Sequence, residues 1–207
     1  LIVTTKVPGR DHGYEETIHS AHASLDRLGL DRIDLYLIHW PNPSVNRYVD
    51  TFQAMIDLQK DGKVGSVGVS NFTEAMLTRL IDETGVTPAV NQVELHPYFP
   101  QGDLRAFHTQ HGIRTESWSP LGRRGELLAE PVIEQVAAAH GVTPTQAVLR
   151  WHTQLGSTPI PKSADSGRQV ENADIFGFTL TDAEVSAISG LERGRLWDGD
   201  PDTHEEM

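Results

Sequence analysis

The sequence predicts an α/β protein of the (β/α)8 barrel class, in which strands and helices alternate along the chain. Six short apolar segments rich in strand-forming residues are each followed by residues with the apolar spacing of a helix. Successive strand and helix units are about thirty residues long, which is typical of such barrels. Several of the strands also end in polar or aromatic residues, at the end where barrel proteins carry their functional groups.

The amino end of the chain indicates that this barrel is incomplete. Residues 1–6 already have the composition of a strand, with no initiator methionine and no lead-in. A closed barrel of this class has eight strands, so two missing first units would explain both this start and the length of 207 residues. We therefore expect about six β/α units over residues 1–192. Residues 193–207 are expected to form a polar tail with little order of its own.

The first elements are marked by clear local signals. A turn follows residues 1–6, and apolar residues then recur on one helical face from Tyr14 to Leu28. Gly29 stands where a left-handed cap ends a helix. The next strand, residues 33–40, is a continuous run of strand formers stopped by Pro41, as in a strand buried on both faces of a parallel sheet.

The same two signals continue to the carboxyl end. Asn71 or Thr73 can cap one helix, Thr143 with Pro144 begins another, and Thr181 opens a capping box before the last. These signals predict strands at 65–71, 89–95, 114–119 and 157–162, and helices around 52–62, 76–81, 103–111, 131–141, after 143, at 165–174 and at 185–191.

Composition excludes several classes of protein. A formal net charge of −12 argues against a nucleic-acid or anionic-membrane surface, because both need a basic footprint. No apolar run is long enough to span a bilayer. The absence of cysteine excludes disulfides and thiolate sites and fits a reducing compartment, so we expect a cytoplasmic protein.

Histidines at helical spacing could in principle bind a metal. His19 with His22 and His108 with His111 are such pairs. Catalytic zinc needs three protein ligands, and no third ligand is evident near either pair. We therefore expect surface histidines and no metal site.

Polar and aromatic residues collect at the ends of the expected strands, and convergence of such groups on one rim is how a barrel builds a site. Each has a plain structural alternative: His39 as a strand cap, Lys6 as a solvated lysine, Trp118 as core packing. The residues at strand ends are Lys6, His39, Trp40, Ser70, Asn71, Trp118, Ser119, Lys162 and Ser163, and Gln92 lies within its strand.

Six separated segments resemble the aldo-keto reductase family in their order and spacing. They are T-T-K (4–6), D-L-Y-L-I-H-W-P (34–41), G-V-S-N-F (68–72), N-Q-V-E-L-H-P (91–97), W-S-P-L-G (118–122) and I-P-K-S (160–163), the last followed by Arg168, Glu171 and Asn172. The resemblance runs from Leu1 to about Leu191. Prokaryotic reductases of small diketo acids look closest, because they too have tryptophan where many relatives have tyrosine in W-S-P-L-G.

The resemblance implies an NADPH-dependent reductase of aldehydes and ketones on a TIM barrel. Members of the family use a tyrosine as general acid, surrounded by a lysine, an aspartate and a histidine. Lys6 matches the lysine and His39 the histidine, whereas the aspartate and the tyrosine belong to a segment before Leu1. The four tyrosines present do not match that motif, and we assign the role to none of them: Tyr14, Tyr36, Tyr48 and Tyr98.

A physical account supports these catalytic roles. Hydride delivered to a carbonyl carbon leaves charge on oxygen, which must be met by a donor and a proton. A lysine ammonium makes a phenol easier to ionise, which is what Lys6 would do for the tyrosine. His39 could donate a hydrogen bond to the carbonyl oxygen without being charged, and Trp40 beside it would border the substrate.

The cofactor would be read by a second set of residues. Ser70, Asn71 and Gln92 can hydrogen-bond a carboxamide in both directions, and Trp118 offers a flat face to the nicotinamide ring. The basic and hydroxyl-bearing cluster at Lys162, Ser163 and Arg168 suits the 2′-phosphate of NADP(H). The resemblance extends the cofactor contacts to Ser119 and Leu121, and Glu171 with Asn172 could hold the adenine amine.

Two other functions stay open from the sequence alone. The chain could be a non-catalytic NADP(H)-binding barrel, because the general-acid tyrosine and its aspartate are absent from it. It could also bind a phosphosugar, which would explain Lys162 and Arg168 but leave Trp118 and Gln92 without a role. No G-x-G-x-x-G motif occurs, so a Rossmann site is not expected. The expected partner is a small carbonyl substrate, and a complete barrel would be a monomer.

Overall fold

The computed structural model describes residues 1–123 and 125–206, and the chain divides into two compact units. The first unit comprises residues 1–92, 103–114 and 199–207, and the second comprises residues 93–102 and 115–198. Parallel strands alternate with helices in both, as the sequence predicts. No helix among the described residues combines the length and the apolar character that crossing a membrane requires.

Most elements of the first unit match the predicted segments within a few residues. In chain order they are β1 (Thr4–Val7), the 3-10 helix η1 (Gly9–Asp11), α1 (Tyr14–Leu28), β2 (Ile33–Ile38), α2 (Tyr48–Lys60), β3 (Val64–Ser70), α3 (Glu74–Thr84), β4 (Val90–Glu94) and α4 (Gly102–His111).

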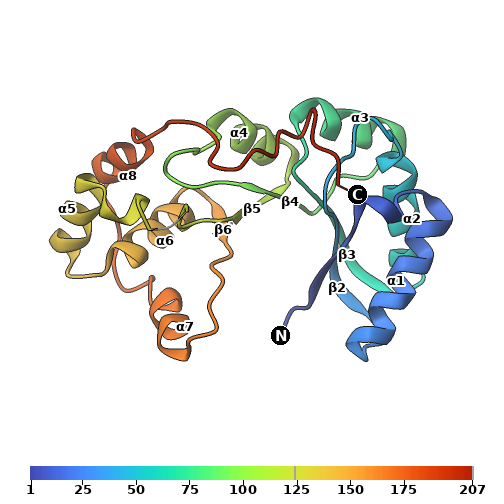
Figure 1. The fold of residues 1–207 in the computed structure, drawn as a ribbon, viewed down its shortest axis with the longest axis horizontal. Helices are drawn as coiled ribbons and strands as arrows, with labels where there is room; N and C mark the ends of the chain where they lie inside the picture. Colours follow the sequence, from blue (N-terminus) through green and yellow to red (C-terminus); the bar gives the residue numbers. More distant parts are fainter. Residues whose placement is uncertain (124, 207) are drawn as a thin grey trace. The chain divides into compact units, whose positions relative to one another are not determined.

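Strands β1 to β4 are hydrogen-bonded in sequence order, and each recorded pair is parallel. Helices α1 and α2 pack against each other, and α2 packs against β3, as the right-hand side of Figure 1 shows. Strand β2 is buried almost throughout, which is why it reads as an uninterrupted apolar run. At Gly68 a Cβ atom would lie 2.8 Å from the backbone oxygen of Val90, so only glycine allows β3 and β4 to approach there.

Several predicted helix caps are confirmed. Gly29 is left-handed (φ 65°) and ends α1, and Thr73 accepts a hydrogen bond from the backbone N–H of Met76 at the start of α3. Thr143 and Thr181 each form a full capping box. These local signals are reliable here because side chain and backbone lie within three residues of each other.

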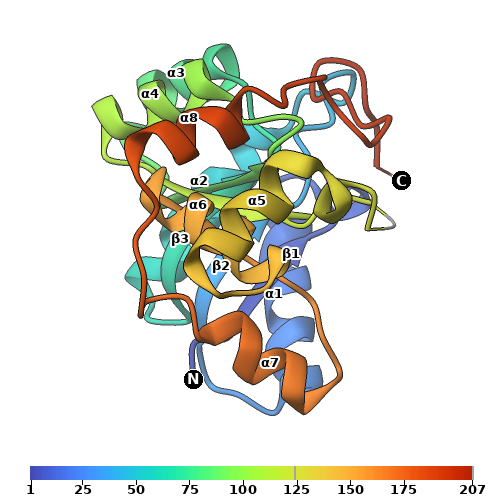
Figure 2. The ribbon, with the colours of Figure 1, turned by 90° about the vertical axis from the view of Figure 1, so that its left-hand side faces the viewer.

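The second unit contains the remaining elements, and α5, α6 and α8 pack together in it (Figure 2). Strand β6 is shorter than predicted, because its pairing with β5 stops near Pro161, which has no N–H to donate. The elements are β5 (Arg114–Trp118), the 3-10 helix η2 (Leu127–Ala129), α5 (Pro131–His140), α6 (Pro144–Gln154), β6 (Ser157–Pro159), α7 (Ser166–Ala173) and α8 (Asp182–Ser189).

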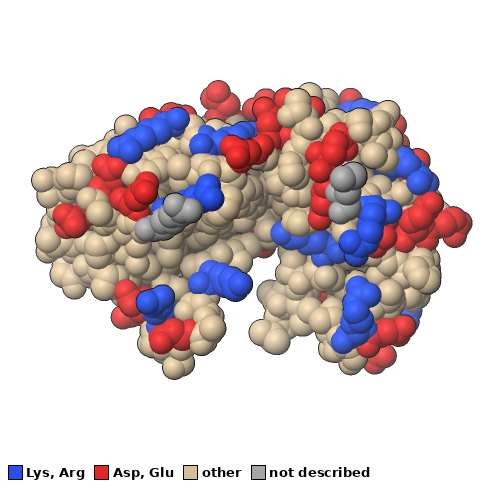
Figure 3. Space-filling model, in the orientation of Figure 1, with Lys and Arg blue, Asp and Glu red and all other residues tan. Residues whose placement is uncertain are grey.

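The prediction of little order in the tail was wrong. In the second unit the backbone N–H groups of Arg193 and Gly194 both donate to the carbonyl of Tyr98 at 2.8 Å. In the first unit the side chain of Asn42 bonds the backbone of Glu206 in both directions. The polar composition of the tail suits these hydrogen bonds to backbone and polar side-chain groups. A polar and acidic composition therefore did not mean that the tail lies free in solvent. Acidic and basic side chains are interspersed on the face drawn in Figure 3.

Two buried histidines make the stability of the fold depend on pH. Burial lowers the pKa of His12 and that of His108 to about 4. The ring nitrogens of His12 have no hydrogen-bond partner among the described residues, and Nε2 of His108 lies 3.0 Å from Nδ2 of Asn91. Since the Asn91 amide can only donate from that atom, His108 is a neutral acceptor.

We predict that the protein loses stability as the pH falls from about 6.5 to about 4. The unfolded chain binds protons on these rings in that range and the folded chain does not, so each buried histidine can cost up to about 3 kcal/mol. Urea unfolding followed over this pH range measures the effect. His108→Gln keeps an acceptor and should lower the pH slope by about one proton. The exposed variant His22→Gln should not, and equal slopes in both would contradict the assignment.

Candidate functional site

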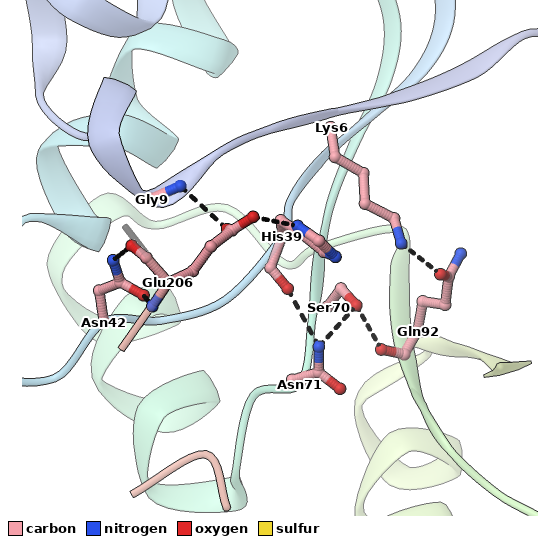
Figure 4. A network of polar contacts seen from close by, with 8 residues as sticks. All are labelled: Lys6, Gly9, His39, Asn42, Ser70, Asn71, Gln92 and Glu206. Carbon is pink, nitrogen blue, oxygen red and sulfur yellow. Dashed lines mark hydrogen bonds and ion pairs between the residues drawn. The ribbon is translucent and has the colours of Figure 1, made fainter. Parts of the chain in front are cut away.

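The parallel register brings the ends of four strands to one edge of the first unit. Val7 pairs with Ile38, Ile38 with Val69, and Ser70 with Gln92, so the residues at or after these pairs lie at the same level. Figure 4 shows the polar side chains that gather there. Lys6 on β1 donates from Nζ to Oε1 of Gln92 on β4 at 2.6 Å, although the two residues are 86 positions apart.

Ser70 and Asn71 hold this edge together. The hydroxyl of Ser70 donates to the backbone carbonyl of Gln92 at 2.7 Å, and the amide of Asn71 donates to the carbonyl of His39 at 3.0 Å (Figure 4). Asn71 has φ 64°, a left-handed conformation that asparagine tolerates better than most residues but that still carries strain. Strain at a strand end is typical of positions where a fold holds side chains for function.

His39 follows β2 and is partly exposed. Its Nδ1 lies 2.7 Å from Oε1 of Glu206, a contact that the sequence analysis missed because 167 positions separate the two residues. His39 and Lys6 line one cavity of about 410 Å³, together with Arg10 and Asp11. The structure therefore brings together five predicted residues of the first unit: Lys6, His39, Ser70, Asn71 and Gln92.

Trp40, the predicted substrate neighbour, lies against the tail. Its ring centroid is 4.1 Å from that of His204, with the two planes tilted by 46°. The indole is partly buried by this contact and by Gly199, where an added Cβ would lie 2.5 Å from the ring. His204 and Gly199 thus cover one side of the tryptophan, and nothing in the sequence predicted this contact.

In the second unit, β5 ends in an aromatic residue and a strained serine. Trp118 lies 6.3 Å from Trp197 between ring centroids, with the planes tilted by 60°. Ser119 has φ 50°, and its carbonyl accepts a hydrogen bond from the N–H of Gly122 in a tight turn. This turn reverses the chain immediately after the predicted nicotinamide-stacking residue.

A buried polar chain supports that turn. The hydroxyls of Ser117 and Ser157 are 2.6 Å apart, Ser157 Oγ lies 3.2 Å from Nδ1 of His152, and Nε2 of His152 lies 3.0 Å from the carbonyl of Pro120. Because a carbonyl only accepts, Nε2 carries the proton and Nδ1 accepts from the Ser157 hydroxyl. His152 was not predicted to take part, because its burial inside α6 gives no sequence signal of this role.

A second cavity, of about 360 Å³, collects the predicted phosphate and adenine residues within the second unit. Asp165 caps α7 by accepting from the N–H of Arg168 at 2.8 Å, which fixes the helix start beside Ser163. Thr145 and Leu128 also line this cavity and were not predicted. The predicted residues that line it are Leu121, Lys162, Ser163, Arg168, Glu171 and Asn172.

One of the histidine pairs considered for metal binding, His108 with His111, has other partners. Nδ1 of His111 donates to the carbonyl of Phe107 at 2.9 Å, and His108 is occupied by Asn91. Within residues 1–123 and 125–206, no three or more histidine, aspartate or glutamate side chains are grouped so that they could hold a metal ion.

Comparisons with known proteins place the chain in a family. Residues 1–193 match the profile described as "Aldo/keto reductase family". The chain is 72% identical over 207 residues to 2,5-diketo-D-gluconic acid reductase B of a Corynebacterium strain, covering all of this chain and 75% of that protein. It is 50% identical over 203 residues to an aldo-keto reductase of Mycolicibacterium smegmatis, covering 98% of this chain and 74% of that one.

The chain belongs to the aldo/keto reductase family. Solved structures agree with this membership. The apo form of Gox0644 superposes with a TM-score of 0.93 at 47% identity, covering 97% of this chain and 74% of that one. A variant of Gox0644 in complex with NADPH gives 0.94 at 46% identity, covering 98% and 75%. The predicted TIM-barrel-type fold is thereby confirmed, and this aldo-keto reductase is an NADP-dependent oxidoreductase that reduces carbonyl groups to alcohols.

Two tyrosines of this aldo-keto reductase chain, Tyr36 and Tyr98, do not have a phenol that is easy to ionise. Burial raises the pKa of Tyr36 to about 12, and burial together with the hydrogen bond from its hydroxyl to Glu130 raises that of Tyr98 to about 12. A neighbouring ammonium would shift a phenol in the opposite direction. Neither residue is therefore assigned a catalytic role.

We predict that Ser157→Ala destabilises the protein by about 1–3 kcal/mol, because it leaves buried partners on Ser117 and His152 without their hydrogen bonds. Urea unfolding measures the difference. Thr158→Ala, one residue further along and exposed, is the matched control and should change stability by less than about 0.5 kcal/mol. A Ser157→Ala protein as stable as the control would show that the chain of hydrogen bonds carries no net energy.

Proposed function

We propose that Lys6 and His39 are the catalytic residues that this chain contributes to carbonyl reduction. Both line one cavity, which is bounded by the end of β1, the residue after β2 and one side of α1, and this single observation carries the proposal. His39 would hydrogen-bond the carbonyl oxygen, where charge develops as hydride reaches the carbon. Lys6 would favour ionisation of the family's tyrosine through its positive charge. Trp40 would border the substrate beside His39.

We propose that the cofactor is NADPH, held by the remaining predicted residues. Ser70, Asn71 and Gln92 carry hydroxyl and amide groups suited to a carboxamide. Trp118 would stack on the nicotinamide ring, with Ser119 and its turn bounding it. The 360 Å³ cavity supports a separate place for the adenosine end, where an anion would meet the start of α7. There Lys162, Ser163 and Arg168 would bind the 2′-phosphate, Glu171 and Asn172 the adenine amine, and Leu121 the apolar face.

A non-catalytic NADP(H)-binding barrel is not favoured. The 72% identical relative is named as a reductase, and that identity extends over the whole of this chain. A phosphosugar-binding barrel would use Lys162 and Arg168 alone, and it would give no reason for the polar edge at Lys6 and Gln92.

We propose a small diketo acid as the substrate class. The name of the 72% identical relative, a 2,5-diketo-D-gluconic acid reductase, supports this choice. Lys6, Arg10 and Arg27 line the cavity that also contains His39, and such cations would favour an anionic substrate over a neutral one.

We also propose a cytoplasmic monomer. The absence of cysteine in the sequence is suited to a reducing compartment. A closed barrel would pair every strand edge and leave none for association with a second copy.

We predict that His39→Ala in the full-length protein lowers the turnover of 2,5-diketo-D-gluconate by on the order of a hundredfold, with little loss of NADPH affinity, because the change removes a donor to the reacting oxygen. Turnover is followed by NADPH absorbance and affinity by fluorescence titration. His19→Ala, which removes another histidine lining the same cavity, is the control. Unchanged turnover in His39→Ala would remove that role, and NADPH binding without any oxidation by the parent protein would restore the non-catalytic alternative.

We predict that replacing Lys162 and Arg168 together by glutamine narrows the preference for NADPH over NADH by on the order of tenfold or more, because a 2′-phosphate loses its charged partners. The ratio of kcat/KM for the two cofactors measures the effect. The control is the double variant Lys60→Gln with Lys63→Gln, which removes the same number of positive charges from exposed positions. A ratio equal to that of this control would exclude the phosphate role.

A further inference from the structure

The end of the chain docks on the loop that follows β2. The side chain of Asn42 donates to the backbone carbonyl of Glu206 at 2.7 Å and accepts from its N–H at 3.0 Å. The N–H of Ser44 donates to the Glu205 carboxylate at 2.8 Å. His204 lies against Trp40. All of these contacts lie within the first unit, so the docked position is defined by several independent interactions.

Both carboxylate oxygens of Glu206 are used. Oε1 lies 2.7 Å from Nδ1 of His39, and Oε2 accepts from the backbone N–H of Gly9 at 2.9 Å (Figure 4). The Gly9 contact fixes the rotation of the carboxylate, and the backbone bonds to Asn42 fix the position of its Cα. At Gly9 an added Cβ would lie 2.1 Å from the backbone oxygen of Glu206, so the docked tail requires glycine there.

We propose that Glu206 is a positioning residue for His39, holding the imidazole with its proton on Nδ1 so that Nε2 is the atom presented to the substrate. The inference rests on the proposed role of His39 in carbonyl reduction. A carboxylate only accepts hydrogen bonds, so the 2.7 Å contact requires the proton on Nδ1. The hydrogen bond made by one ring nitrogen of a histidine sets the state of the other.

This arrangement changes how His39 can act. With the proton on Nδ1, a neutral ring presents a lone pair at Nε2 and cannot donate from it. Donation to a carbonyl oxygen then requires the imidazolium, in contrast to the neutral donor expected from the sequence. Lys6, Arg10 and Asp11 line the same cavity as His39. Glu206 is the carboxylate in direct contact with the ring.

A purely structural role for Glu206 makes a different prediction. Asn42, Ser44 and Trp40 also hold the tail, so a mere anchor at Glu206 would affect stability but leave the ring of His39 unchanged. The state of the His39 ring is therefore the measurement that separates the two roles.

The test is nitrogen NMR of the imidazole rings in the full-length protein, with His39 assigned from the signals lost in His39→Asn. In the parent protein at alkaline pH we expect Nδ1 of His39 to be protonated. In Glu206→Gln the amide can accept from only one of the two donors, so the Nδ1-protonated form should lose its dominance. Glu205→Gln removes the same charge one residue away and should keep the parent pattern. A His39 spectrum unchanged by Glu206→Gln would overturn the proposal.

A kinetic measurement accompanies the spectrum. We expect Glu206→Gln to lower kcat for a diketo acid by on the order of tenfold to a hundredfold with unchanged NADPH affinity, and Glu205→Gln to leave kcat near the parent value. A fall in NADPH affinity without a fall in kcat would contradict a role through His39. If the parent protein does not oxidise NADPH, the proposed function fails while the NMR result still decides the position of the proton.

Discussion

The parallel register of β1, β2, β3 and β4 is the constraint on which the candidate site depends. Each strand pairs with its neighbour so that Val7, Ile38 and Val69 are level, and Gln92 is level with Ser70. A shift of one residue in any pair would turn the following side chains to the opposite face of the sheet. The buried apolar residues of β2 and β3 fix this register, so the energy that places the polar edge comes from the core beneath it.

The polar edge in turn reinforces the register. Lys6 reaches Gln92 across two intervening strands, and Asn71 ties the end of β2 to the end of β3 in a strained conformation. A buried or half-buried group of this kind costs desolvation, which is offset only when its partners are in place. The same atoms therefore stabilise the fold and form the proposed site, so loss of one partner would affect both. In the second unit, hydrogen bonds run from Ser117 through Ser157 and His152 to the carbonyl of Pro120. They hold the turn at Ser119 in the same way.

Much of this could be predicted from the sequence, because its signals are local. The helix from Tyr14 to Leu28, the cap at Thr143 and the box at Thr181 each depend on residues within a few positions of one another. The residues at strand ends could also be predicted, because each strand end is marked locally and parallel sheets bring those ends together. What the sequence did not reveal were contacts between distant positions. His39 with Glu206 and Ser117 with Ser157 leave no periodicity, and a polar tail has the same composition whether it is solvated or docked on backbone groups.

Because Glu206 lies on the tail and not on a strand, its carboxylate is held less firmly than a strand residue would be. A carboxylate carried on a strand would be held by the sheet and would keep His39 in one state as long as the fold exists. A carboxylate on residues 199–206 is held by a handful of hydrogen bonds worth about 1 kcal/mol each, so its release costs far less than unfolding the sheet. The proposed proton position on His39 would thereby be linked to the docking of residues 204–206. Under the roles proposed for Glu206 and His39, a shift of that docking would change the ring atom presented to the substrate, although neither β1 nor β2 need move.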